Sequence, residues 1–201
     1  MNDDPIFTST HQALHFSYLI EAYEVAPESI MAITLRRLMK ELMIWEDGYQ
    51  PSGIDFSGLT PLEVRAQCAI IRRAVKTELS EVQAWVVQAR FGITEVSNIK
   101  GKKVFHFSRE RQNAILRLGE CFMYVADMSE LEVDALIVRH FSHKARKNIN
   151  FSSMQRDFGK SRMTYSRAYK TIEDRCNAIE KTAIDVLRAR FERHGVIAVA
   201  A

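Results

Sequence analysis

The sequence predicts an all-α protein with one short β-hairpin, and three observations lead to this prediction. Apolar residues recur at helical spacing along most of the chain, and capping signals precede several of these stretches. Gly and Pro are scarce, with eight and four of the 201 residues, so few positions interrupt a helix. Residues 93–107 read as β-structure instead, because β-branched and aromatic residues there flank Lys100-Gly101-Lys102-Lys103. A hairpin is therefore expected near residues 95–107, with an exposed basic loop as the alternative.

The expected helices begin at recognisable signals. One helix is expected from His11, and a second from Pro27 to about Trp45. Turn-forming residues then gather between Glu46 and Leu59. Thr60-Pro61-Leu62-Glu63 restarts a helix, because Thr60 can accept the first free N–H groups and Glu63 can close a capping box. Ser108 and the Ser129-Glu130-Leu131-Glu132 segment start two further helices in the same way.

The composition is that of an ordinary soluble protein, with 47% apolar and 26% charged residues. No apolar run approaches the roughly 18 residues that span a bilayer, and the acidic start Met1-Asn-Asp-Asp-Pro is unlike a secretory signal. We therefore expect a cytoplasmic protein with no membrane segment. Cys68, Cys121 and Cys176 are far apart and are expected to be apolar core residues.

No enzyme signature is present in the sequence. It contains no P-loop, no dinucleotide-binding glycine pattern and no His-Glu-x-x-His motif. We therefore expect no catalytic activity, no cofactor and no metal site.

Positive charge is concentrated in one part of the chain. Residues 1–138 contain fourteen Lys/Arg and nineteen Asp/Glu, a net charge of −5, and residues 171–201 are neutral. Residues 139–170 contain nine Lys/Arg against Asp157 alone, a net charge of +8. Such clustering is typical of a surface that contacts the phosphate backbone of nucleic acid.

The basic segment contains a predicted helix-turn-helix between Asn150 and Lys170. Phe151, Met154 and Phe158 are spaced to anchor a short first helix on a core. Gly159 tolerates the left-handed backbone of the turn, and Ser161 can cap the second helix. The second helix is then expected to present its first turns to the major groove of double-stranded DNA.

Two groups of residues in this region are expected to contact DNA. The first group faces outward from the second helix and is assigned to base edges or adjacent phosphates: Arg162, Met163, Thr164, Ser166, Arg167 and Lys170. The second group is assigned to phosphates: Lys144, Arg146, Lys147, Lys160 and the Ser161 backbone at the helix N-terminus. Tyr165, Tyr169 and Ile172 are expected to pack inward. The lysines at the tip of the 95–107 hairpin either contact nucleic acid or are solvated.

The predicted helix-turn-helix resembles the C-terminal helix-turn-helix of bacterial sigma factors. The residues that carry the resemblance are Phe151-Ser-Ser-Met154 and Phe158-Gly159-Lys-Ser161-Arg162-Met-Thr164-Tyr165-Ser166-Arg167. Phage late-gene antitermination proteins of the Q type contain a similar module. The preceding helix, ending at Phe141, also fits, so the resemblance covers about residues 130–175. It implies a phage or prophage antitermination factor that binds promoter-proximal DNA and RNA polymerase. Lys160 and Gln155 depart from the family pattern, and the zinc element of many Q-type proteins is missing from this sequence.

The second helix is expected to continue to about His194. Seven residues from Tyr165 to Val186 follow one another in steps of four and three, which makes an apolar seam at heptad spacing. The seam is expected to pack on the N-terminal helices of the same chain, with a homodimer as the alternative. The chain is thus divided into an N-terminal helical segment (1–59), a central helical region (60–127) and a helix-turn-helix domain with a long terminal helix (128–201).

Alternatives to antitermination remain open at the level of sequence. Within DNA binding, they are a simple repressor or activator and a packaging protein like a terminase small subunit. Outside DNA binding, the alternative is a helical interaction module whose basic face binds an acidic protein.

Overall fold

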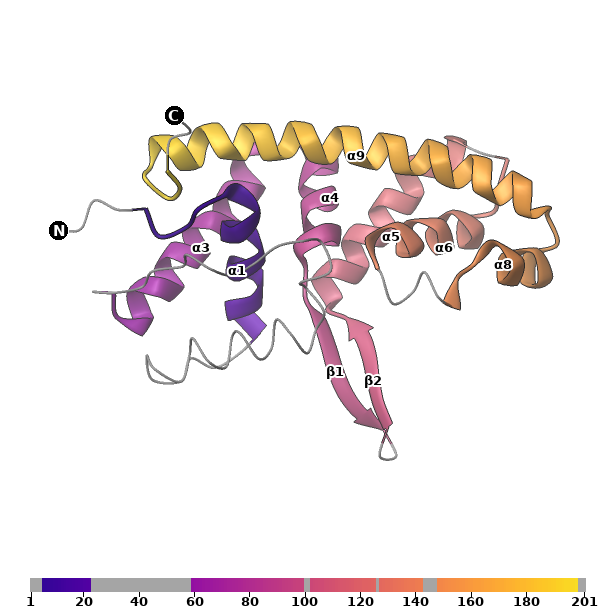
Figure 1. The fold of residues 1–201 in the computed structure, drawn as a ribbon, viewed down its shortest axis with the longest axis horizontal. Helices are drawn as coiled ribbons and strands as arrows, with labels where there is room; N and C mark the ends of the chain where they lie inside the picture. The colour runs from indigo at the N-terminus through magenta and orange to yellow at the C-terminus, as the bar shows by residue number, and fades with distance from the viewer. Residues whose placement is uncertain (1–4, 23–58, 100–101, 126, 143–147, 199–201) are drawn as a thin grey trace. The chain divides into compact units, whose positions relative to one another are not determined.

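A computed structural model describes residues 5–22, 59–99, 102–125, 127–142 and 148–198. Their elements are helical except for one hairpin, which confirms the predicted fold class (Figure 1). The predicted helix between residues 27 and 45 and the turn-rich segment before Leu59 lie outside the described residues. No helix in the described ranges is long and apolar enough to cross a membrane.

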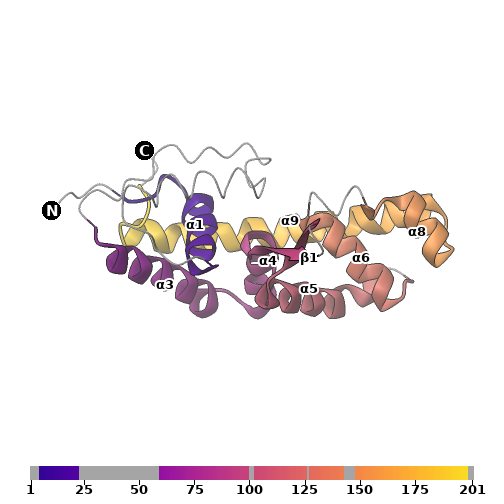
Figure 2. The same cartoon turned by 90° about the horizontal axis from the view of Figure 1, so that it is seen from below.

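In chain order, the elements are α1 (Thr10–Ala22), α3 (Pro61–Glu78), α4 (Glu81–Phe91), β1 (Thr94–Ile99), β2 (Lys102–Phe107), α5 (Arg109–Phe122), the 3-10 helix η2 (Met123–Val125), α6 (Glu130–Phe141), α8 (Phe151–Phe158) and α9 (Arg162–Arg193). The two strands pair with each other in opposite directions, as predicted (Figure 1). Figure 2 shows α9 as one continuous helix from a second direction.

The helix starts follow the expected local chemistry. The Thr60 hydroxyl accepts the Glu63 N–H at 3.3 Å, and the Glu63 carboxylate accepts the Thr60 N–H at 2.7 Å. The Ser108 hydroxyl accepts the Arg111 N–H at the start of α5. Glu132 accepts the Ser129 N–H at 2.8 Å at the start of α6. The predicted starts of these three helices are confirmed. They could be predicted from sequence because each cap involves residues only three positions apart.

The chain divides into two compact units, and each is described by itself. The first comprises Met1–Leu79, Phe91–His106 and Ile184–Ala201, and the second comprises Ser80–Arg90 and Phe107–Ala183. The predicted three-part division of the chain stays a prediction. Because α9 runs from Arg162 to Arg193, this helix contributes residues to both units.

In the first unit, α1 packs on α3 through buried apolar residues. Those on α1 include Leu14 and Tyr18, and those on α3 include Cys68 and Ile71. Phe7 forms a parallel bridge with Ile197, so the described N-terminal and C-terminal segments of this unit are paired.

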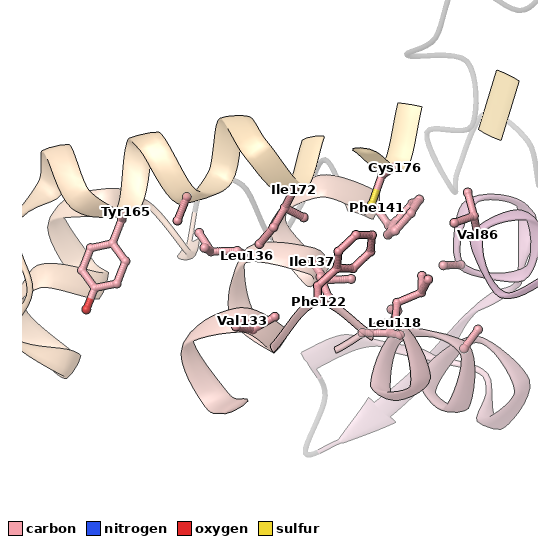
Figure 3. Packing of buried hydrophobic residues seen from close by; sticks show 14 of the residues in the cluster. Val86, Leu118, Phe122, Val133, Leu136, Ile137, Phe141, Tyr165, Ile172 and Cys176 are labelled. Carbon is pink, nitrogen blue, oxygen red and sulfur yellow. The ribbon is translucent and has the colours of Figure 1, made fainter. Parts of the chain in front are cut away.

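The core of the second unit gathers residues from α4, α5, α6, α8 and α9. Figure 3 shows how those from α4, α5, α6 and α9 pack together. Its largest fully buried side chains are Leu118 of α5, Leu136 and Ile137 of α6, Met154 of α8, and Tyr165 and Ile172 of α9. The apolar seam predicted on α9 is covered from Tyr165 to Cys176 by α4, α5, α6 and α8 of the same unit. The seam in this part of α9 therefore packs within the chain, but on these helices and not on the expected N-terminal ones.

Two sequence-based assignments of buried residues outside the helix-turn-helix are wrong. Val186, expected on the seam, is 39% exposed, and Ile184 and Leu187 are buried in its place. A straight α-helix of 3.6 residues per turn drifts away from a strict heptad spacing, so the buried stripe moves by this point of α9. Cys121, expected in the core, is exposed on α5, whereas Cys68 and Cys176 are buried.

Arg111 joins the C-terminal ends of two helices in the second unit. Its side chain is buried, and it donates to the carbonyl oxygens of Ala89 at 2.9 Å and Phe141 at 2.7 Å. Its guanidinium carbon lies 4.5 Å from the Phe107 ring centroid. Burial lowers the pKa of Arg111 to about 10, so the group is still charged at neutral pH. The cation fits there because the carbonyls that end a helix carry partial negative charge.

Candidate nucleic-acid interface

The first helix of the motif, α8, begins at a reciprocal cap. The Asn150 side chain accepts the Ser153 N–H at 2.8 Å, and the Ser153 hydroxyl accepts the Asn150 N–H at 3.1 Å. Met154 is buried, and Phe151 packs partly on the core, as expected. The predicted anchoring by Phe158 is wrong, since this side chain is 40% exposed. Phe158 is the last residue of α8, and only part of its ring is covered where the chain leaves the helix.

The turn between α8 and α9 has three residues, Gly159, Lys160 and Ser161, as predicted. Gly159 has φ 91°, a left-handed conformation, and its N–H donates to the Gln155 carbonyl at 2.9 Å. The Ser161 hydroxyl accepts the Thr164 N–H at 3.1 Å and so caps α9. Figures 1 and 2 both show α8 beside the first turns of α9. The structure thus contains the predicted helix-turn-helix.

The first turns of α9 have a buried side and an exposed side. Tyr165 and Ile172 are fully buried, and Tyr169 is partly buried. At 100° per residue, Met163, Arg167 and Lys170 lie opposite this buried stripe. Met163 is 62% exposed. Of the remaining predicted DNA contacts, Arg162, Thr164 and Ser161 are exposed, and Ser166 is partly buried.

The cations of the basic segment differ in how they are held. Arg162 lies 3.4 Å from the Ser152 hydroxyl of α8. Lys170 forms ion pairs with Asp174 at 2.8 Å and Glu173 at 3.8 Å, and the hydrogen bond to Asp174 raises the pKa of Lys170. Arg167 is exposed and has no ion-pair partner among the described residues. Arg167 is therefore available to a ligand without breaking an ion pair, whereas Lys170 is not.

Three basic residues counted in the segment contribute to the fold or to local pairs. The Arg139 guanidinium lies 4.5 Å from the Phe151 ring centroid and 5.3 Å from that of Tyr169, and it donates to the Ile149 carbonyl at 2.7 Å. Arg156 pairs with its neighbour Asp157 at 2.9 Å. Lys160, predicted to bind phosphate, pairs with Glu132 at 3.3 Å and is only 35% exposed. The predicted phosphate contacts Lys144, Arg146 and Lys147 lie outside the described residues.

Glu132 of α6 is the residue at this site that the sequence did not identify. It is 4% exposed, and it accepts the Tyr165 hydroxyl at 2.7 Å in addition to its cap on Ser129 and its pair with Lys160. Burial raises the pKa of Glu132, but hydrogen bonds from Ser129, Tyr165 and Lys160 outweigh this effect and lower it to about 2. The Tyr165 pKa is raised to about 12 by burial and by this carboxylate. The capping box predicted the bond to Ser129, but no local signal links Glu132 to a residue 33 positions later.

The tip of the hairpin, residues 100 and 101, lies outside the described part of the chain, so its predicted contact with nucleic acid stays a prediction. In comparisons with known proteins, no family model, curated protein or solved structure matches this chain.

Proposed function

We propose that this protein is a DNA-binding transcription regulator that reads double-stranded DNA with the first turns of α9. The observation that carries the proposal is the division of that helix into a buried stripe and an exposed basic face. Tyr165 and Ile172 hold the helix on the core, while Met163, Arg167 and Lys170 face away from it. A helix held in this way can enter the major groove without unfolding any of its core.

Each residue of the face has a chemical role in the proposal. Arg167 donates two hydrogen bonds to the O6 and N7 acceptors of a guanine, which is the commonest specific pairing of a side chain with a base. Met163 packs on a thymine methyl group. Lys170 and Arg162 bind phosphates, together with the N–H groups at the N-terminus of α9. The DNA-contacting face of α9 ends at Asp174 on its C-terminal side, because the Asp174 carboxylate repels phosphate.

The narrower proposal is antitermination. The resemblance of residues 130–175 to the sigma-factor and Q-type modules supports a factor that holds promoter-proximal DNA while it engages RNA polymerase. The acidic charge of residues 1–138 also supports a division of labour, because a net charge of −5 disfavours DNA contact by that part. A factor of this kind should allow a purified polymerase to read through a terminator in vitro. A repressor or activator would change initiation only.

Selection of duplexes from a random pool, with core RNA polymerase present and absent, tests the proposal. We expect one enriched sequence for the wild-type protein. Arg167→Ala should lose roughly 1–3 kcal/mol of discrimination at one base pair, because one bidentate contact is removed. Arg188→Ala is the matched control, since Arg188 is exposed on α9 but lies far beyond the proposed face and pairs with Asp185. Equal selection by Arg167→Ala and wild type would contradict the assignment.

A further inference from the structure

The turn of the helix-turn-helix is joined to α6 through one buried carboxylate. We propose that Glu132 is a positioning residue that sets the docking of α9 on DNA and keeps Lys160 away from the phosphate backbone. This inference rests on the proposed DNA-binding function, and it assigns Glu132 and Lys160 roles that the motif does not predict.

Both oxygens of Glu132 are occupied by groups from different elements. Oε1 accepts the Tyr165 hydroxyl at 2.7 Å. Oε2 accepts the Ser129 N–H and hydroxyl, each at 2.8 Å, and the Lys160 ammonium at 3.3 Å. The carboxylate has little freedom to rotate, because the buried Tyr165 hydroxyl would remain unsatisfied if Glu132 turned away from it.

Tyr165 transmits this constraint to α9. It lies in the first turn of the helix, and its ring is fully buried while its hydroxyl bonds to Glu132. The same hydroxyl accepts the Lys160 N–H at 3.4 Å. One side chain thus connects the turn, the first turn of α9 and the N-terminus of α6. A rotation of α9 about its axis would break the hydrogen bond between Tyr165 and Glu132. It would also move Arg167 away from the guanine that it contacts in the proposed complex.

The Lys160 side chain crosses from the turn toward α6. Its ammonium donates to the Asp127 carbonyl and pairs with Glu132. To reach a phosphate, Lys160 would have to leave a carboxylate that is almost fully buried, and an unpaired buried charge is strongly unfavourable. Phosphate contacts strengthen binding to every sequence alike, whereas base contacts discriminate. By holding Lys160, Glu132 therefore lowers non-specific affinity and favours specific binding.

Glu132→Gln separates this role from a merely structural one. The glutamine oxygen can still accept a hydrogen bond from Tyr165, but the charge that holds Lys160 is removed. We expect Lys160 to bind phosphate in this variant. Binding to a scrambled duplex should then tighten several-fold, and its slope of log affinity against log salt should steepen by about 0.9, the value for one added phosphate contact. The ratio of specific to non-specific affinity should fall several-fold.

Three companion variants complete the measurement. Lys160→Met alone should leave the salt slope unchanged, because Lys160 does not contact phosphate in the wild-type protein. Glu132→Gln with Lys160→Met should return the slope to the wild-type value. Tyr165→Phe, which keeps the buried ring, should lower the ratio of specific to non-specific affinity. It should not change the slope of log affinity against log salt. Circular dichroism and thermal unfolding of each variant verify that it is folded before binding is measured.

The outcomes distinguish the two proposals. If the wild-type protein bound no duplex in a salt-dependent way, the proposed function would be overturned, and the role of Glu132 in it as well. If the wild-type protein bound DNA but Lys160→Met alone flattened the slope by about 0.9, Lys160 would be an ordinary phosphate contact. An unchanged slope in a folded Glu132→Gln variant would likewise overturn the positioning role while leaving DNA binding intact.

Discussion

At the scale of single residues, Glu132 makes the stability of the second unit dependent on pH. The folded-state pKa of about 2 lies below the ordinary 4.5, so the ionised carboxylate stabilises the fold above about pH 4.5 and this contribution is lost as the pH falls toward 2. We expect Glu132→Gln to lower the free energy of unfolding by roughly 2–3 kcal/mol at pH 7. The difference from wild type should shrink between about pH 5 and pH 2, because protonated Glu132 is neutral like glutamine. Urea unfolding of both proteins across this pH range measures the difference in unfolding free energy. A difference that did not change with pH would contradict the lowered pKa of Glu132.

Gly159 is a second residue whose role can be measured alone. A Cβ added there would meet no atom within 4 Å, but the backbone has φ +91°. The expected effect of Gly159→Ala is therefore conformational strain without a steric clash, a loss of roughly 1–2 kcal/mol of unfolding free energy. Gly159→Asn should lose less, because asparagine tolerates left-handed backbone better. Thermal unfolding of the two variants compares them, and equal losses would show that strain is not the cause.

At the scale of the elements, the sequence predicts what is decided by neighbouring residues. The caps at Thr60, Ser108 and Ser161 are predictable because each involves donors and acceptors three positions apart. The three-residue turn is predictable because Gly159 permits a conformation that other residues disfavour. The buried and exposed sides of the first turns of α9 are also predictable, because they follow from the helical spacing of the apolar residues along the sequence.

The features that the sequence did not predict depend on contacts between distant parts of the chain. Arg139 contributes to the positive charge expected to face DNA, but it stacks on Phe151 and Tyr169. Lys160 is expected at a phosphate, but it pairs with Glu132 of another helix. A basic side chain looks the same in a sequence whether its partner is a phosphate, an aromatic ring or a buried carboxylate. The charge of +8 in residues 139–170 therefore overstates the cations that are available to DNA.

Arg111 gives a prediction about how the helices of the second unit are joined. Arg111→Met keeps much of the apolar volume but leaves the carbonyl oxygens of Ala89 and Phe141 without this donor. We expect a loss of roughly 2–4 kcal/mol of unfolding free energy, because unsatisfied buried acceptors are unfavourable. Arg109→Met is the control, since Arg109 is exposed at the start of the same helix. Denaturant unfolding compares the two, and similar small losses would show that Arg111 does not join α4 and α6.

At the scale of the whole molecule, the distribution of charge agrees with the proposed division of labour. The nine Lys/Arg of residues 139–170 belong to a chain whose first 138 residues are net acidic. Under the proposed function, non-specific attraction to DNA would come from residues 139–170, and the net negative charge of residues 1–138 would disfavour orientations that bring that part to the duplex. Few strong phosphate contacts and a positioned base-reading helix would give a modest salt slope together with a high specificity ratio.

The stripe along α9 decides whether folding needs a second copy of the chain. Ile172 is fully buried among residues of the second unit, whereas Val186 is 39% exposed. Ile172→Ala should lower the free energy of unfolding by roughly 2–4 kcal/mol, because it leaves a cavity in a packed core. Val186→Ala should change it by less than about 0.5 kcal/mol.

A seam closed within one chain also requires that the unfolding midpoint of the wild-type protein does not change with protein concentration, since only association makes it concentration-dependent. A midpoint that rose over a hundredfold range of concentration would instead show that a dimer stabilises the fold, and a large loss in Val186→Ala would place the dimer contact on α9.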